Sequence, residues 1–228
     1  MVILFLLGGL QGAIGWIMVQ SGLNDSDIGV DHIRLAIHFI CALFLLVYLV
    51  WFTLMVSVPA KEIIYTPKLK RLNIILLILL FVQLIYGAFM AGTHAALNAP
   101  TWPDINGLYI PTGMFANGGL WHNLYFQPLA IQFVHRTLAY LIGILVIVWF
   151  YKAWNRTSSA SLLFRFSRVP LLLVIVQITL GVLALLNSMY KTSIYYSVVH
   201  QFMGMLLLTS LVVTLFLSKK RRKIDFDS

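Results

Sequence analysis

Three histidines lie near the start of long apolar stretches of this chain, where an ionisable side chain is costly and is therefore a candidate for function. They are His38, His135 and His200. Imidazole nitrogens are ligands for iron, and the helices of a four-helix bundle can present two of them to one haem. For a single histidine, the alternative is a hydrogen bond to a neighbouring helix without any metal. Three histidines in equivalent positions favour haem ligation.

Each histidine follows an apolar stretch in which a glutamine precedes a glycine by four residues. A glycine in a membrane helix usually permits close packing, and a glutamine usually bonds to a neighbouring helix. Three copies indicate a duplicated unit of one outward helix and one inward helix that carries the histidine near its outer end, and units four helices apart would form a parallel repeat. Chance recurrence in apolar helices is the alternative. The pairs are Gln11 and Gly15, Gln83 and Gly87, and Gln177 and Gly181.

The elements that must position these residues are six membrane-spanning helices. Of the 228 residues, 61% are hydrophobic and 10% are charged, and the mean hydropathy is +0.92. A soluble domain of this size could not bury so much apolar surface, so the solvent must be a lipid bilayer. A span needs about 20 mostly apolar residues. The stretches that qualify are 2–20, 34–58, 71–92, 130–152, 168–189 and 197–218. The predicted fold is an all-α integral membrane protein.

Basic residues predict the orientation of these spans. Thirteen of the sixteen lysines and arginines fall after the second, fourth and sixth spans, and segment 93–129 holds none. The positive-inside rule then places both termini in the cytoplasm and the long loop outside. This clustering beside apolar stretches argues against nucleic-acid binding, despite a net charge of +9. The single cysteine, Cys41, excludes an internal disulfide.

Two arginines lie outside these clusters and close to histidines. Arg136 follows His135 directly, and Arg34 precedes His38 by four residues, about one helical turn. A guanidinium at the outer rim could hold haem propionates through charge-assisted hydrogen bonds. It could instead extend to lipid headgroups, and the sequence leaves both roles open. His94, at the outer end of the third span, is a weaker candidate ligand.

Five features make the chain resemble the haem A synthase family of cytochrome oxidase assembly. They are GGLQGAIGWIMVQSGL at 8–23, RLAIH at 34–38, TWPDINGLYIP at 101–111, QFVHR at 132–136, and His200. Family members have eight spans in two four-helix halves, and this chain would correspond to spans three to eight. The resemblance implies one complete four-helix haem-binding bundle plus two helices of a second half, related by a parallel pseudo-two-fold repeat. The expected parts are a partial N-terminal half at 1–60, a C-terminal haem b half at 61–218 and a basic cytoplasmic tail at 219–228.

The resemblance also implies a reaction and its ligands. The family oxidises a ring methyl of haem O to a formyl group, which makes haem A. His135 and His200 would be the axial ligands of a haem b, with Arg136 beside them. His38 and Arg34 would serve the substrate haem, with His38 as an iron ligand. The implied location is the bacterial cytoplasmic membrane. Haem O synthase, oxidase assembly factors or further copies of the chain are the expected partners.

No catalytic residue can be assigned on this resemblance. The glutamate proposed for the family would lie in a span that this chain lacks, and its counterpart in the C-terminal half is Gln132, which is not a carboxylate. We therefore expect the chain alone to bind one haem and not to make haem A. The outer loops lack the paired cysteines of some members, so thiol–disulfide control is not expected.

Two other classes of protein compete with this interpretation. A b-type cytochrome that only carries electrons would have no need of the loop motif at 101–111. A transporter would line a path at the midplane with polar residues. The predicted spans contain no aspartate or glutamate, and the three histidines lie off the midplane, which places the transporter third.

Overall fold

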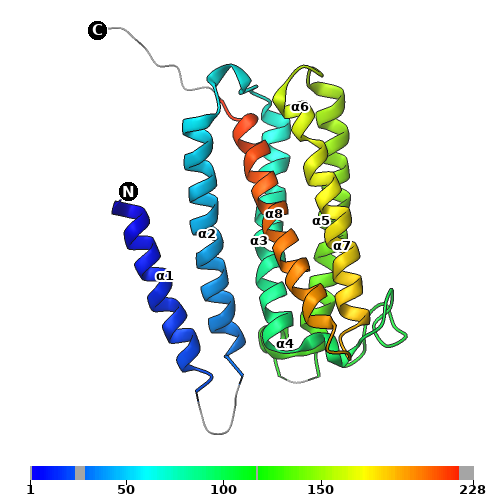
Figure 1. Cartoon of the computed structure of the whole chain (residues 1–228). Helices are drawn as coiled ribbons and strands as arrows, with labels where there is room; N and C mark the ends of the chain where they lie inside the picture. The colour runs from blue at the N-terminus through cyan, green and yellow to red at the C-terminus, as the bar shows by residue number, and fades with distance from the viewer. Residues whose placement is uncertain (1, 24–28, 117, 221–228) are drawn as a thin grey trace.

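The computed structural model describes residues 2–23, 29–116 and 118–220, and it is built from helices that run roughly side by side (Figure 1). Six helices are long and apolar enough to cross a membrane, which confirms the predicted all-α membrane fold. The fifth candidate span joins a short helix to a long one, from Leu162 to Leu186. The long helices are α1 (Val2–Gln20), α2 (His32–Ser57), α3 (Pro67–Gly92), α5 (Pro128–Arg156), α7 (Arg168–Leu186) and α8 (Ser193–Leu217).

Several helices begin earlier than the apolar stretches predicted. The start of α2 is set by Asp31, whose carboxylate accepts a hydrogen bond from the backbone N–H of Arg34 at 2.9 Å. In α3 and α5 a proline, Pro67 or Pro128, occupies the first turn, where a backbone N–H has no helical partner in any case. Hydropathy marks the apolar part of a span, whereas these polar and proline signals mark where the helix begins.

Four of the long helices form a bundle. Helix α3 packs against α5 and α8, and α7 packs against the same two neighbours, so that the four make a closed ring. Helix α2 packs outside this ring against α3 and α8, and α1 lies at the edge against α2 (Figure 1). None of the residues of α1 is buried. The predicted tail at 219–228 lies outside the described residues except for its first two.

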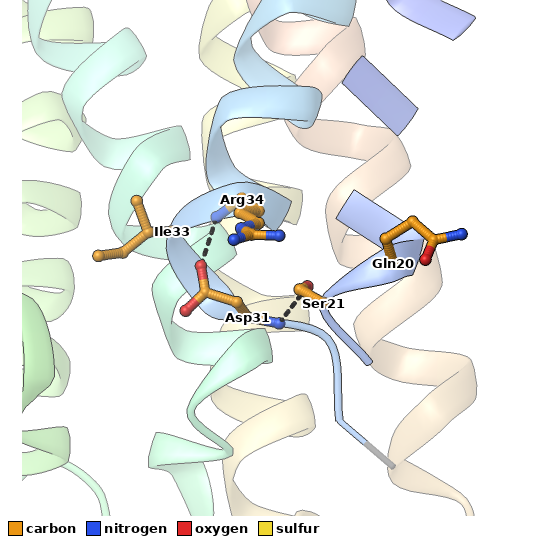
Figure 2. Close-up of a pocket in the computed structure, with 5 residues that line it drawn as sticks. All are labelled: Gln20, Ser21, Asp31, Ile33 and Arg34. Carbon is orange, nitrogen blue, oxygen red and sulfur yellow. Dashed lines mark hydrogen bonds between the residues drawn. The ribbon is translucent and has the colours of Figure 1, made fainter. Parts of the chain in front are cut away.

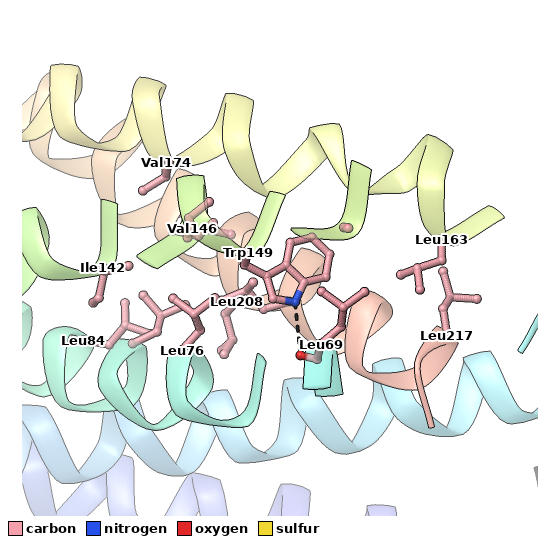
Figure 3. Packing of buried hydrophobic residues seen from close by; sticks show 14 of the residues in the cluster. Leu69, Leu76, Leu84, Ile142, Val146, Trp149, Leu163, Val174, Leu208 and Leu217 are labelled. Carbon is pink, nitrogen blue, oxygen red and sulfur yellow. Dashed lines mark hydrogen bonds between the residues drawn. The ribbon is translucent and has the colours of Figure 1, made fainter. Parts of the chain in front are cut away.

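The tightest packing lies toward one end of the bundle. We call it the basic end, because the connections at 58–66 and 157–167 lie there together with the lysines and arginines that follow the second and fourth predicted spans. Trp149 is fully buried, and its indole N–H donates to the backbone carbonyl of Leu69 at 3.2 Å (Figure 3). Leu163 and Leu217 are fully buried in the same cluster. This packing joins all four helices of the bundle.

A buried amide ties two helices together in the same region. Asn73 of α3 is fully buried, and its side-chain amide donates to the hydroxyl of Thr214 at 2.8 Å and to the carbonyl of Leu211 at 3.2 Å. Such bonds are favourable in an apolar interior, where no water is present to satisfy the polar groups.

The opposite end, which we call the loop end, carries segment 93–127. This segment is more structured than a plain loop. It contains the 3-10 helix η2 (Ala95–Asn98) and the short helix α4 (Leu120–Phe126). Two further short helices, η1 (Ala60–Glu62) and α6 (Leu162–Phe166), lie at the basic end. The hydropathy pattern predicted none of these four short elements.

Candidate functional site

The three candidate histidines occupy equivalent places in their helices. His38 is the seventh residue of α2, and His135 and His200 are each the eighth residue of α5 and α8. At a rise of about 1.5 Å per residue, all three lie about 10 Å from the start of the helix. Because the helices begin earlier than predicted, each histidine lies farther from the start of its helix than the sequence predicted. The distance is still similar in all three helices.

The repeated glutamine contacts the histidine of its own helix pair in all three copies. In each case the side-chain amide nitrogen of a glutamine on α1, α3 or α7 lies within hydrogen-bonding distance of an imidazole nitrogen of the next long helix. The amide-to-imidazole distances are 3.1 Å for Gln11 and His38, 3.3 Å for Gln83 and His135, and 3.3 Å for Gln177 and His200.

The repeated glycine makes room for the imidazole ring. A Cβ atom added at Gly15 would lie 2.9 Å from Cε1 of His38, and one added at Gly181 would lie 2.9 Å from Cε1 of His200. At Gly87 the equivalent distance to the third imidazole is 3.5 Å, an ordinary contact. The spacing of glutamine and glycine is therefore explained by a single histidine that both residues touch. Descent of the three helix pairs from one duplicated unit stays a prediction.

The structure brings His135 and His200 together inside the bundle. Their ring centroids are 6.5 Å apart, and the ring planes are inclined at 70°. Metal–imidazole bonds are about 2 Å long, so two imidazoles on opposite sides of one ion have centroids about 6 Å apart. The separation of the two rings therefore fits one iron between them.

The orientation of His200 also fits a ligand. Its Nδ1 lies 3.0 Å from the backbone carbonyl of Gln177, and a carbonyl can only accept a hydrogen bond. Nδ1 therefore carries the proton, and Nε2 keeps the lone pair that a metal requires. This is the arrangement usual for metal-binding histidines, whose second nitrogen donates to a carbonyl or carboxylate.

At the level of these two histidines, α3 has three buried residues, Leu84, Ala88 and Phe89, whereas the other three helices of the bundle have none. Residues 133–141 of α5, 175–184 of α7 and 193–203 of α8 include no buried residue. Buried packing resumes at Ile142 and Gly204, toward the basic end. The described part of the chain contains no cluster of three or more histidine, cysteine or carboxylate side chains, and a haem iron takes only two axial ligands from a protein.

His38 is not part of this pair. It faces α1, where the amide of Gln11 also donates to its backbone carbonyl at 3.0 Å. One turn earlier, the exposed guanidinium of Arg34 donates to the carbonyl of Ile17 at 3.3 Å.

Arg34 lines an open pocket of about 550 Å³ between the ends of α1 and α2. Its other lining residues are Gln20, Ser21, Asp31 and Ile33, as Figure 2 shows.

Arg136 has partners that neither predicted role included. Its guanidinium donates to the backbone carbonyls of Asp104, at 2.6 Å, and Thr101 in the loop motif. Gln132, one turn earlier, is fully buried and donates to the carbonyl of Ala99 at 3.1 Å. Within the motif QFVHR, Gln132 and Arg136 therefore bind the loop, whereas His135 lies inside the bundle.

The loop that these residues hold has a defined conformation. Its turn has positive φ angles of 53° at Asn106 and 85° at Gly107. Glycine adopts such an angle without cost, and asparagine is one of the few other residues that adopt it often. The backbone N–H of Gly107 donates to the Asp104 carboxylate at 2.9 Å, and this bond, followed by that of the Thr101 side chain, lowers the pKa of the carboxyl below its usual range. The indole N–H of Trp102 donates to the hydroxyl of Tyr140 on α5 at 2.9 Å.

The remaining histidines lie at the loop end. His32 begins α2, lies 2.9 Å from the carbonyl of Tyr125 through Nε2, and packs edge-on against Phe89. His94 and His122 are both exposed. The contact of His32 with Tyr125 joins α2 to α4. The sequence does not predict this contact, because His32 lies in a part of the chain that is rich in loops.

Comparison with known proteins supports the resemblance seen in the sequence. A family model described as cytochrome oxidase assembly protein, COX15-CtaA, matches residues 1–212. A protein of Granulibacter bethesdensis named heme A synthase is 36% identical over 218 residues, which are 94% of this chain and 55% of that protein. One of Flavobacterium psychrophilum with the same name is 34% identical over 215 residues, covering 93% of this chain and 62% of that protein.

A third relative, from Parvibaculum lavamentivorans and also named heme A synthase, is 40% identical over 160 residues, or 70% of this chain and 46% of that protein. The chain spans about half the length of these curated relatives. The family match over most of the chain, the six apolar helices and the placement of the histidines agree with one another, and the chain belongs to the cytochrome oxidase assembly family that includes the haem A synthases.

Proposed function

We propose that this chain acts in haem A biosynthesis, in which a ring methyl of haem O is oxidised to a formyl group for cytochrome oxidase assembly. The observation that carries the proposal is the pairing of His135 and His200, whose ring centroids lie 6.5 Å apart within the bundle. The names of the relatives give the product, haem A, and the pair of imidazoles would supply a place for the haem b that the family resemblance implies.

In this proposal His135 and His200 are the two axial ligands. A haem with two histidine ligands has no open position for oxygen, so it supplies electron transfer rather than oxygen binding. The chain orients the ligands: the carbonyl of Gln177 keeps the proton of His200 on Nδ1, and Gly181 lets the ring approach α7. Arg136 holds the loop at 101–111 over this end of the bundle through two backbone carbonyls.

The substrate haem is assigned to the side of α1 and α2. His38, which like His200 contacts a glutamine and a glycine of the preceding long helix, would be an iron ligand there. Arg34 lines the open pocket at the same end and could meet a propionate. The chain would then divide into a substrate side at 1–60 and a haem b half at 61–218. No catalytic residue is assigned.

We also propose the orientation and the partners that the sequence implied. The basic end would face the bacterial cytoplasm, because the lysines and arginines gather there. The loop end would face outward. Haem O synthase, assembly factors of the oxidase or further copies of this chain are the partners in this proposal.

An electron-carrying b-type cytochrome would use the same histidine pair. The matched family and the names of the relatives favour haem A formation instead. The transporter finds no support in the family match.

The optical spectrum of the purified chain tests the haem site. We expect a sharp reduced α-band with two-histidine character, which the substitution His200→Ala should abolish. His122→Ala is the matched control, because His122 is exposed and lies outside the bundle. A normal spectrum in the His200 variant would show that the assigned ligand pair is wrong.

The reaction needs a separate test. Membranes that contain this chain and a supply of haem O can be extracted and the haems separated. Haem A in the extract would support the synthase and would refute the expectation that this chain alone does not make haem A. A two-histidine spectrum without haem A is the expected result, and it would leave either an electron carrier or a synthase that needs a further subunit.

A further inference from the structure

Two of the three glutamine–histidine contacts, those at His135 and His200, have a feature that ligation alone does not explain. At His200, Nδ1 donates to a backbone carbonyl, so Nε2 holds the lone pair, and the amide of Gln177 lies 3.3 Å from that same Nε2. At His135, too, the amide of Gln83 lies 3.3 Å from Nε2. An amide nitrogen only donates, so it bonds to the lone pair of the ring.

One lone pair cannot serve two partners. An unprotonated imidazole nitrogen has a single lone pair in the plane of the ring, which can accept a hydrogen bond or bind a metal. The side-chain amide and an iron therefore exclude each other on the same nitrogen.

We propose that Gln83 and Gln177 are exchange partners of the ligand nitrogens, so that they set how tightly the chain holds haem. This inference rests on the proposed function, in which His135 and His200 ligate haem. When Nε2 passes from the amide to iron, one hydrogen bond breaks and one coordinate bond forms, and no proton or electron is transferred. The glutamine stabilises the histidine that has released its iron, and in doing so it weakens haem binding.

The third contact, between Gln11 and His38, differs from the other two in the atoms that it joins. Gln11 lies 3.1 Å from Nδ1 and 3.4 Å from Nε2 of His38, and it also donates to the backbone carbonyl of that residue at 3.0 Å. A neutral imidazole has one nitrogen with a lone pair, so the amide of Gln11 can bond to only one of these two ring nitrogens, and its bond to the backbone carbonyl does not compete with a metal.

Haem partition between this chain and an excess of a soluble haem-binding acceptor protein tests the inference. The full chain in detergent is loaded with haem, and the fraction transferred at equilibrium is read from the absorbance. We expect Gln177→Leu and Gln83→Leu each to raise the affinity for haem about twofold to tenfold, the range of one lost competing hydrogen bond. Gln177→Met, which keeps the length of the side chain, should act in the same direction if the leucine variant folds poorly.

Gln201→Leu is the matched control, because this exposed glutamine follows His200 on α8 and should leave the partition unchanged. An unchanged or lower affinity in the Gln177 and Gln83 variants would overturn the exchange role, and a lower affinity would mean that the amides position the rings. Failure of the proposed haem site would look different, because the wild-type chain would then lack the two-histidine spectrum altogether.

Discussion

The close approach of the His200 ring to α7 makes Gly181→Ala an informative substitution. The added Cβ would lie 2.9 Å from Cε1 and 3.4 Å from Nδ1 of the imidazole. Carbon atoms in contact prefer about 3.5–4.0 Å, so the ring must retreat by at least about 0.5 Å. That movement takes Nδ1 away from the carbonyl of Gln177, now 3.0 Å away, and alters the placement of Nε2. Overpacking of this kind costs about 1–3 kcal/mol.

Gly87→Ala is the matched control for this prediction. There the new Cβ would lie 3.5 Å from Cε1 of His135, which requires no movement of the ring. Both substitutions lie within membrane-spanning helices and gain the same helix propensity of about 1 kcal/mol, so the difference between them reports the ring contact alone.

The assay is haem content per protein together with the reduced spectrum, and thermal unfolding in detergent reports the fold. A cost of about 1–3 kcal/mol corresponds to a loss of haem affinity of about fivefold to 150-fold for Gly181→Ala, with Gly87→Ala close to wild type. Equal haem content in the two variants would refute the argument, since it would show that the ring does not depend on the space at Gly181.

Three further substitutions test other parts of the structure. Arg136→Lys should loosen the loop motif, because a lysine cannot reproduce the two-carbonyl contact of the guanidinium, and limited proteolysis within the loop should become faster. Asn73→Leu should lower stability by about 1 kcal/mol in thermal unfolding, since the hydroxyl of Thr214 loses its buried donor. The hydrogen bond from Gly107 to the Asp104 carboxylate should protect that amide from hydrogen exchange above about pH 4. Because the pKa of the folded carboxyl is lowered, this protection is lost as the pH falls through that lower value, and Asp104→Ala should abolish it at all pH values.

Much of the membrane architecture could be predicted because it depends on local composition. Each span is a long apolar stretch, and the lipid leaves helices as the only way for such a chain to satisfy its backbone. The spacing of glutamine and glycine was also informative, since both residues were expected to contact a neighbouring helix. The sequence could not show that they share one target, because that depends on the rotation of the helices about their axes.

The role of the QFVHR motif was beyond sequence reasoning. Arg136 was assigned either to a propionate or to lipid, yet it contacts the carbonyls of Thr101 and Asp104. Binding of a propionate by Arg136 stays a prediction. The sequence identifies Gln132 only as a residue that stands in place of a carboxylate, but its side-chain amide donates to the carbonyl of Ala99. Backbone carbonyls leave no trace in a sequence, so a side chain that binds them has no visible partner.

The uneven packing of the bundle bears on the order in which the protein is assembled. The basic end has a dense core around Trp149, whereas α5, α7 and α8 have no buried residue around His135 and His200. Local opening costs least free energy where such contacts are few. In the proposed function, the helices would therefore associate in the membrane first and accept haem afterwards, through transient separation of the bundle at its loop end. Insertion of the chain and loading of its haem would then be independent steps, and a cell short of haem would accumulate folded apoprotein rather than an unfolded chain.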